Sequence, residues 1–99
     1  MKCFFVAQIS IHDPDEYQKY LDGFDEVFSR HKGVVMAVDE DPTVLEGAWS
    51  CTRTVLIGFP NEDEARRWYD SPGYQELVKH RRRASTANIV LVKRRAKAP

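Results

Sequence analysis

Two ionisable side chains, His31 and Arg81, stand on otherwise apolar faces of expected helices, where they could take part in chemistry. His31 follows Phe28 by three residues and Val27 by four, which places it at the inner end of the first expected helix. An imidazole there is either a proton acceptor or ligand, or the more common helix-end histidine that bonds to a backbone carbonyl. His31 is therefore a catalytic candidate with an ordinary structural alternative.

Arg81, the second catalytic candidate, follows Leu77 by four residues on the inner face of the last expected helix. A guanidinium on a buried face needs an acceptor, because a buried unpaired charge costs too much free energy. Two interpretations stay open. One is a structural ion pair with Glu46 or Asp70, and the other is an anchor for an anionic ligand, which the forked guanidinium suits.

Large aromatic side chains with polar tips gather near the same helices, notably in the stretch RRWYDSPGYQ, residues 66–75. Such side chains usually pack in cores and interfaces, but they also line clefts between helices and a sheet. The candidate substrate-binding residues are therefore Trp49, Arg53, Trp68, Tyr69, Tyr74 and Arg81.

Other kinds of site have no support in the sequence. There is no phosphate loop, dinucleotide fingerprint, HExxH motif or Ser-His-Asp spacing, so we expect no cofactor. The two cysteines, Cys3 and Cys51, lack the spacing of a metal site. They head two strands that we expect to run parallel side by side, which would bring the thiols near each other. A disulfide is still not expected in a reducing compartment.

Composition indicates one globular domain over residues 1–99, since 42% of the residues are hydrophobic and 30% are charged. Residues 1–50 carry four Lys and Arg against ten Asp and Glu, whereas residues 51–99 carry eleven against five. This asymmetry indicates either a basic binding tail or, as we favour, an acidic half that complements a basic half. No signal peptide and no run of ~20 apolar residues is visible, so we predict a cytoplasmic protein without a membrane segment.

The elements that must position the candidates follow from hydrophobic periodicity and capping signals. Asp13, Asn61 and Ser71 each suit the first cap of a helix, with Pro14 and Pro72 in first turns. Gly33 is expected to end the first helix. The expected strands are residues 4–11, 34–38, 53–59 and 88–93. This βαββαβ order predicts an α+β, ferredoxin-like fold, an antiparallel sheet with its helices on one face.

The second face of that sheet is also apolar in the sequence. In the last strand Val90 and Val92 point away from Ile89 and Leu91, and all four are apolar. An uncovered apolar face of this size marks an interaction site, and a second copy related by a two-fold axis covers it most simply. We therefore predict a homodimer through the open sheet face.

Several motifs together resemble one bacterial family, the domain of unknown function 1330 (DUF1330) family, over nearly the whole chain. They are VLEGAW (44–49), RTVLIGFP (53–60), ARRWYDSPGYQ (65–75), Arg81 and the closing VLV. The resemblance implies the dimeric α/β-barrel superfamily, whose members generally use the cleft between helices and sheet. Two positions depart from the family pattern: HKG (31–33) stands for a frequent HGG, and Gly73 for a usual Glu.

The resemblance does not indicate a reaction, because no reaction is established for the family. Related dimeric α/β-barrel proteins include cofactor-free monooxygenases, muconolactone-isomerase-like enzymes, haem-handling enzymes and stress-response proteins. Whether this chain is an enzyme therefore stays open.

The sequence offers three candidate functions. The first is a protein that binds or transforms a small carboxylate or aromatic molecule, with Arg81 on the carboxylate and His31 as proton acceptor. The alternative is a non-catalytic structural or stress-associated homodimer. RNA binding is disfavoured, because the third strand carries one aromatic residue and the sheet face is apolar rather than basic.

Overall fold

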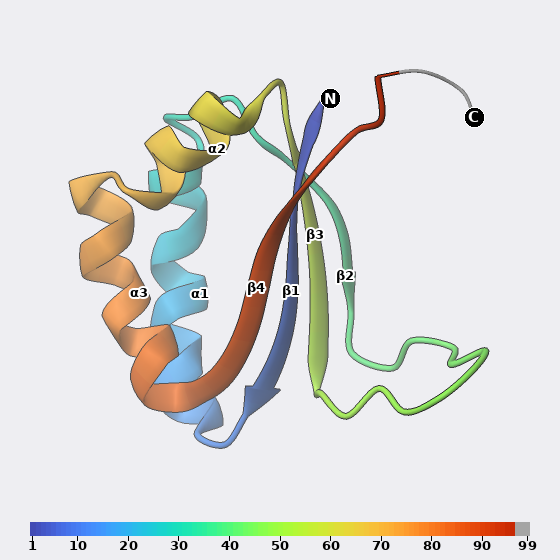
Figure 1. Ribbon diagram of the computed structural model, residues 1–99. Coiled ribbons are helices and arrows are strands. Elements are labelled where there is room, and N and C mark those ends of the chain that lie inside the picture. The colour runs from blue at the N-terminus through green and yellow to red at the C-terminus, as the bar shows by residue number, and fades with distance from the viewer. Residues whose placement is uncertain (97–99) are drawn as a thin grey trace.

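The computed structural model describes residues 1–96 and has three helices on one side of a four-stranded sheet (Figure 1). In chain order the elements are β1 (Cys3–Ile11), α1 (Pro14–Phe28), β2 (Val34–Asp39), β3 (Arg53–Phe59), α2 (Glu62–Tyr69), α3 (Pro72–Ala84) and β4 (Ser85–Lys93). The strands lie in the order β2-β3-β1-β4, and every neighbouring pair is antiparallel. The α+β, ferredoxin-like fold is therefore confirmed. Among residues 1–96, no helix is long and apolar enough to cross a membrane.

The three predicted helix caps are confirmed, and they explain where each helix begins. The side chain of Asp13 accepts a hydrogen bond from the Glu16 backbone N–H at 3.1 Å, and Asn61 caps α2 in the same way. Ser71 makes the joint between α2 and α3, since its hydroxyl donates to the Trp68 carbonyl at 2.7 Å and accepts from the Tyr74 N–H at 3.2 Å. One side chain thus ends α2 and starts α3.

Gly33 has a different role from the predicted one. Helix α1 ends at Phe28, and a turn separates it from Gly33. Gly33 does not adopt the positive φ of a glycine helix cap; among the described residues only Gly47 has a positive φ. A Cβ at residue 33 would instead lie 2.6 Å from the Phe28 ring and 2.7 Å from the Phe59 ring. Close approach of two aromatic rings, rather than helix capping, requires glycine here.

Strand β4 begins at Ser85, three residues before the predicted start. Ser85 pairs directly with Ile11 at the end of β1, and its hydroxyl donates to the Arg81 carbonyl at 2.6 Å. The chain therefore passes from α3 into β4 without a loop, which fixes the end of α3 against the sheet.

The predicted proximity of the two thiols is wrong, because β1 and β3 are antiparallel. Cys3 pairs with Phe59, at one end of the two strands. Cys51 precedes Arg53, which pairs with Ile9 at the opposite end. Both cysteines are free.

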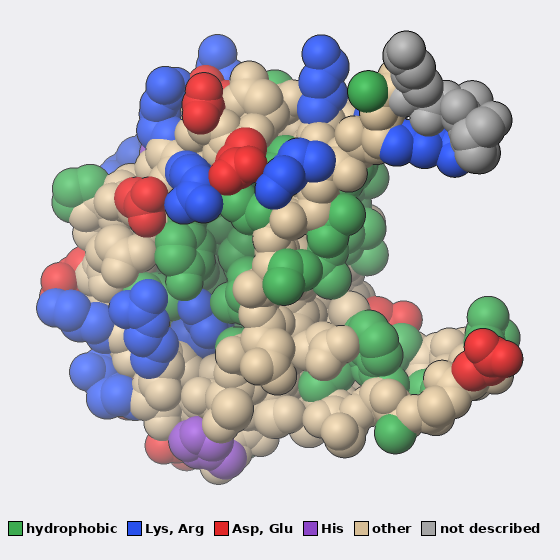
Figure 2. Space-filling view, viewed as in Figure 1, with side chains coloured by type: hydrophobic (Ala, Val, Ile, Leu, Met, Phe, Trp, Pro, Cys, Tyr) green, Lys and Arg blue, Asp and Glu red, His purple; other side chains and the backbone are tan. Residues whose placement is uncertain are grey.

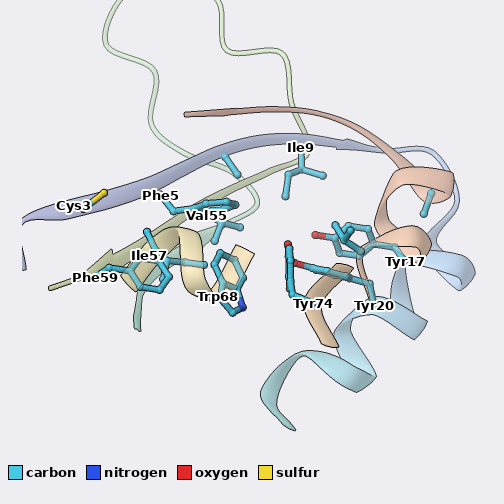
Figure 3. Close-up of a cluster of buried hydrophobic side chains, with 14 residues drawn as sticks. Cys3, Phe5, Ile9, Tyr17, Tyr20, Val55, Ile57, Phe59, Trp68 and Tyr74 are labelled. Carbon is cyan, nitrogen blue, oxygen red and sulfur yellow. The ribbon is translucent and has the colours of Figure 1, made fainter. Parts of the chain in front are cut away.

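Trp68 is the centre of the core between the helices and the sheet (Figure 3). Its side chain is fully buried. Its ring centroid lies 4.3 Å from that of Tyr74, 5.2 Å from Phe5 and 5.5 Å from Phe59. These partners come from three elements, so the indole joins α2 to α3 and to both central strands.

We expect Trp68→Ala to lower the free energy of unfolding by about 3–5 kcal/mol, because it leaves a large cavity at the centre of the core. Trp68→Phe should cost clearly less, since the indole Nε1 has no hydrogen-bond partner to lose. Urea denaturation followed by circular dichroism measures both. A loss below about 1 kcal/mol for Trp68→Ala would contradict this assignment of the core.

Glu16 links the start of α1 to the last turns of α3. Its carboxylate contacts His80 Nδ1 at 2.5 Å and the Arg83 guanidinium at 3.2 Å. The hydrogen bond from His80, followed by that from Arg83, lowers the pKa of Glu16 to about 2. This contact holds the segment of α3 that carries Arg81.

Because the pKa of Glu16 is lowered in the folded protein, the contribution of this carboxylate to stability decreases as the pH falls. A carboxylate with a depressed pKa in the folded state stabilises the protein fully above its ordinary pKa of 4.5. That contribution disappears as the pH falls from 4.5 toward 2. We expect Glu16→Gln to lower the urea midpoint at pH 6 and to have a smaller effect at pH 3, where part of the contribution is already lost.

Glu26→Gln is the matched control, since it removes a carboxylate from an exposed pair with Arg30 inside α1. An equal loss for Glu16→Gln at both pH values would show that its ionised form contributes no stability.

Candidate functional site

A cavity of about 330 Å³ lies between α1 and the helix-covered face of the sheet. This volume is near the lower end of the roughly 300–1,000 Å³ typical of ligand sites, so it suits a small molecule. Its walls are mainly apolar and come from α1 and all four strands, with Leu21, Phe24, Ile9, Val35, Val55 and Ile89 among the lining residues. Tyr17, Tyr20, Arg53 and Arg81 supply the polar part of the wall, and the exposed Asp25 completes it.

Arg81 reaches the cavity from α3 and is only 4% exposed. Its guanidinium lies 5.9 Å from the ring centroid of Tyr20, and its Nε atom has no hydrogen-bond partner. Neither Glu46 nor Asp70, nor any other carboxylate of residues 1–96, forms an ion pair with it. Of the two interpretations left open for Arg81, the structural ion pair is therefore not found among residues 1–96.

The Arg81 guanidinium keeps its charge despite this burial. Loss of water around it lowers the pKa of Arg81, but the oxygens of Tyr74 and Tyr20 raise it, and the net shift is upward. The cavity wall therefore holds a buried cation that no carboxylate of the described chain neutralises.

Three phenol hydroxyls meet beside this cation. Figure 3 shows the hydroxyls of Tyr17, Tyr20 and Tyr74 directed toward one another below Ile9. The Tyr20 and Tyr74 oxygens are 2.7 Å apart and share a hydrogen bond. Burial raises the pKa of Tyr20 well above its ordinary value, and it also raises the pKa of Tyr74 against the opposing charge of Arg81. The phenols are therefore neutral near pH 7 and can donate hydrogen bonds.

Arg53, at the start of β3, brings a second guanidinium to the same cavity. Its side chain is 16% exposed and lies 5.8 Å from the ring centroid of Tyr17. Burial raises the pKa of the Tyr17 phenol, and the charges of Arg53 and Arg81 both oppose that rise. Tyr17 thus lies within the electrostatic reach of both cations.

Two cations and two neutral phenols in the wall of an apolar cavity can bind an anion or stabilise negative charge that develops on oxygen, with the Tyr74 hydroxyl behind them on Tyr20. No group of three or more His, Cys, Asp or Glu residues within 1–96 is arranged to hold a metal ion. Asp25 is the lining residue whose carboxylate could accept a proton.

The predicted site residues do not form one site in the structure. Arg53 and Arg81 lie together in the cavity wall. Trp68 and Tyr74 are fully buried core residues, although the Tyr74 hydroxyl reaches the phenol cluster. Tyr69 lines two shallower hollows at the β4 edge of the sheet.

The other two candidates lie away from the cavity. Trp49 donates from its indole nitrogen to the Thr54 hydroxyl at 2.9 Å. Thr54 pairs with Gln8, and both belong to the strand positions that alternate to the uncovered face of the sheet. His31 is in the turn after α1 and does not line the cavity.

Tyr17 and Tyr20 are not among the predicted site residues, because their spacing marks them only as apolar positions of α1. The signal was present in their chemistry, since both carry a hydroxyl on the inner helix face and so bring polar groups to a buried surface. Asp25 gave no signal in the sequence because it belongs to the exposed acidic part of α1.

Solved structures with the same fold span nearly the whole chain. A protein of unknown function from Rhodopseudomonas palustris superposes with a TM-score of 0.76 at 17% identity, covering 96% of this chain and 83% of its own. SnoaB, a cofactor-independent oxygenase from Streptomyces nogalater, has a TM-score of 0.65 at 23% identity, covering 99% and 97%. A dimeric ferredoxin-like protein of unknown function from Thermobifida fusca has 0.65 at 13% identity, covering 94% and 91%.

At these identities the likeness shows the fold alone. No curated protein matches the chain. The family model of DUF1330, a domain of unknown function, matches residues 2–94.

Proposed function

This chain belongs to the DUF1330 family, and we propose that it binds a small carboxylate with an aromatic or other apolar body in the cavity between α1 and the sheet. One observation carries the proposal: the Arg81 guanidinium is buried, keeps an unpartnered Nε and has no carboxylate partner within residues 1–96. A buried cation without a counterion is costly, and a bound carboxylate would supply the missing partner.

The surroundings of Arg81 suit such a ligand. Apolar side chains such as Ile9 and Phe24 would contact its body, and the phenols of Tyr17 and Tyr20 would donate to its oxygens. The same donors would stabilise an enolate or phenolate if the bound molecule were transformed. The catalytic role of His31 stays a prediction, since its side chain does not line this cavity.

The test is Arg81→Met, with benzoate and 1-naphthoate as probes in isothermal titration calorimetry. Loss of a hydrogen bond to a charged group costs about 1.5–3 kcal/mol, so carboxylate affinity should fall roughly ten- to hundred-fold. Benzamide, which lacks the charge, should bind wild type and variant alike. Arg82→Met, at an exposed position of the same helix, is the control and should leave binding unchanged.

The stability of Arg81→Met separates a ligand anchor from a structural residue. Replacement of a buried unpaired charge by an apolar side chain of similar volume should keep or raise the free energy of unfolding without ligand. A lower urea midpoint combined with unchanged benzoate affinity would make Arg81 structural and remove the proposal.

We also propose that the chain forms a homodimer through the sheet face that the helices leave uncovered. This face carries two cross-strand apolar rows, Leu56–Val6–Val90 and Gly58–Phe4–Val92. Val90 is 56% exposed and Val92 is 48% exposed. Figure 2 shows hydrophobic side chains along this side, where the surface is hollowed above the projecting β2–β3 loop.

A second copy is the occupant that these rows favour, because they would pack against themselves across a two-fold axis. The ferredoxin-like protein from Thermobifida fusca shares the fold and is dimeric, which supports a homodimer. A structural homodimer without a ligand is the second candidate function, and the uncovered face is the observation that favours it.

Val90→Asp should convert the dimer to a monomer, because it places a charge in the middle of the proposed interface. Val35→Asp is the matched control, since Val35 is 41% exposed but pairs with Ile57 and lines the cavity on the other face. Light scattering after size exclusion measures the mass. A wild-type monomer at micromolar concentration, or a dimer that survives Val90→Asp, would refute this interface.

A further inference from the structure

Arg53 lies where the cavity described above meets a second, shallower hollow. It lines both spaces together with Tyr17 and Leu21. The Arg53 side chain is mostly buried, yet its Nε has no hydrogen-bond partner. Arg53 therefore has an unused hydrogen-bond donor at the mouth of the site, and Arg81 on α3 has one deeper in the cavity wall.

Glu40 is the one carboxylate of residues 1–96 within ion-pair distance of Arg53, and the contact is weak. Its Oε1 lies 3.9 Å from the Arg53 Nη1, which is beyond hydrogen-bond length. The Glu40 side chain is 69% exposed and follows the last residue of β2, where the β2–β3 loop begins. Because Glu40 is exposed and the contact is long, this pair contributes little to stability, so a better-placed carboxylate could displace Glu40 at low cost.

We propose that Arg53 forms a second anion subsite at the mouth of the cavity, held by Glu40 when no ligand is bound, and that the protein selects small aromatic molecules with two anionic groups. The inference rests on the proposed function, because Arg81 binds the first anionic group. Glu40 is then a specificity residue that competes with the second.

The geometry between the two cations fits a ligand with charge at both ends. Ile9 pairs with Arg53 on β3 and with Ala87 on β4, so its apolar side chain lies in the same cross-strand row as Arg53. Tyr17 and Tyr20, whose ring centroids are 5.5 Å apart, each lie against one guanidinium. A flat apolar ring would thus lie over Ile9 and beside the tyrosines, with an anionic group toward each arginine.

Two guanidiniums in the wall can each take a carboxylate partner. Arg53 and Arg81 bring two positive charges to the lining, and Asp25 brings one negative charge on an exposed residue. With Glu40 displaced, a ligand with two negative charges gives each guanidinium a carboxylate partner. A monoanion would leave Arg53 with Glu40 and gain from Arg81 alone.

The experiment compares the three benzenedicarboxylate isomers with their monoamides, which keep nearly the same shape but carry one charge less. Isothermal titration calorimetry at constant ionic strength measures each pair on wild type, Arg53→Met, Arg53→Gln and Glu40→Gln. Glu46→Gln, at another exposed position of the same loop, is the matched control. Urea denaturation verifies that each variant is folded.

We expect wild type to bind at least one dicarboxylate about ten-fold more tightly than its monoamide, as one added charged hydrogen bond allows. Both Arg53 variants should abolish that preference, and they should weaken the monoamide much less than the dicarboxylate because the single charge of the monoamide binds Arg81. Glu40→Gln should raise the affinity for the dicarboxylate several-fold, whereas Glu46→Gln should not.

The outcomes separate this inference from the proposed function. If no isomer is preferred, or if the preference survives both Arg53 variants, the second subsite is refuted while Arg81-dependent binding of the monoamide still supports the first. A Glu40→Gln variant that binds the dicarboxylate more weakly would also overturn the subsite, since Glu40 would then assist the ligand. If no probe binds in an Arg81-dependent way, both proposals fail.

Discussion

The position of the joint at Ser71 determines how the space between helices and sheet is divided. Because Ser71 ends α2 directly after Trp68 and Tyr69, the indole fills the end of that space beside Phe59. Helix α3 then runs about 15 Å from the joint to Arg81, at 1.5 Å per residue, and reaches the other end of the sheet. One end is therefore packed with aromatic rings, and the other end keeps a cavity beside a charged group.

The aromatic rings of residues 66–75, the stretch that looks most like a binding wall in the sequence, belong mainly to the core. Trp68 and Tyr74 are fully buried, so their bulk supports the cavity from behind. This follows from the capped break in the helix, which turns large rings inward where a continuous helix would spread them around its surface. The core and the site are built from the same segment because Tyr74 packs on Trp68 with its ring and bonds Tyr20 with its hydroxyl.

Local patterns predicted the elements well, since caps and periodicity act over a few residues. The order of helices and strands along the chain, the three caps and the uncovered apolar face all follow from signals of this range. The errors concern relations between distant segments. The separation of Cys3 and Cys51 depends on strand direction, and the close approach at Gly33 depends on how Phe28 meets Phe59. The missing acceptor of Arg81 depends on where every carboxylate of the chain lies, which no local pattern encodes.

The start of β3 connects the two faces of the sheet, because successive residues of a strand point in opposite directions. Arg53 points to the cavity and contacts Glu40 at the beginning of the β2–β3 loop. Thr54 points to the uncovered face and accepts a hydrogen bond from Trp49 near the end of that loop. The loop is therefore attached to β3 from both sides, by a weak ion pair facing the ligand and by an indole on the face proposed for the second copy. A ligand that takes Arg53 from Glu40 would release only the first attachment and leave the indole attachment in place.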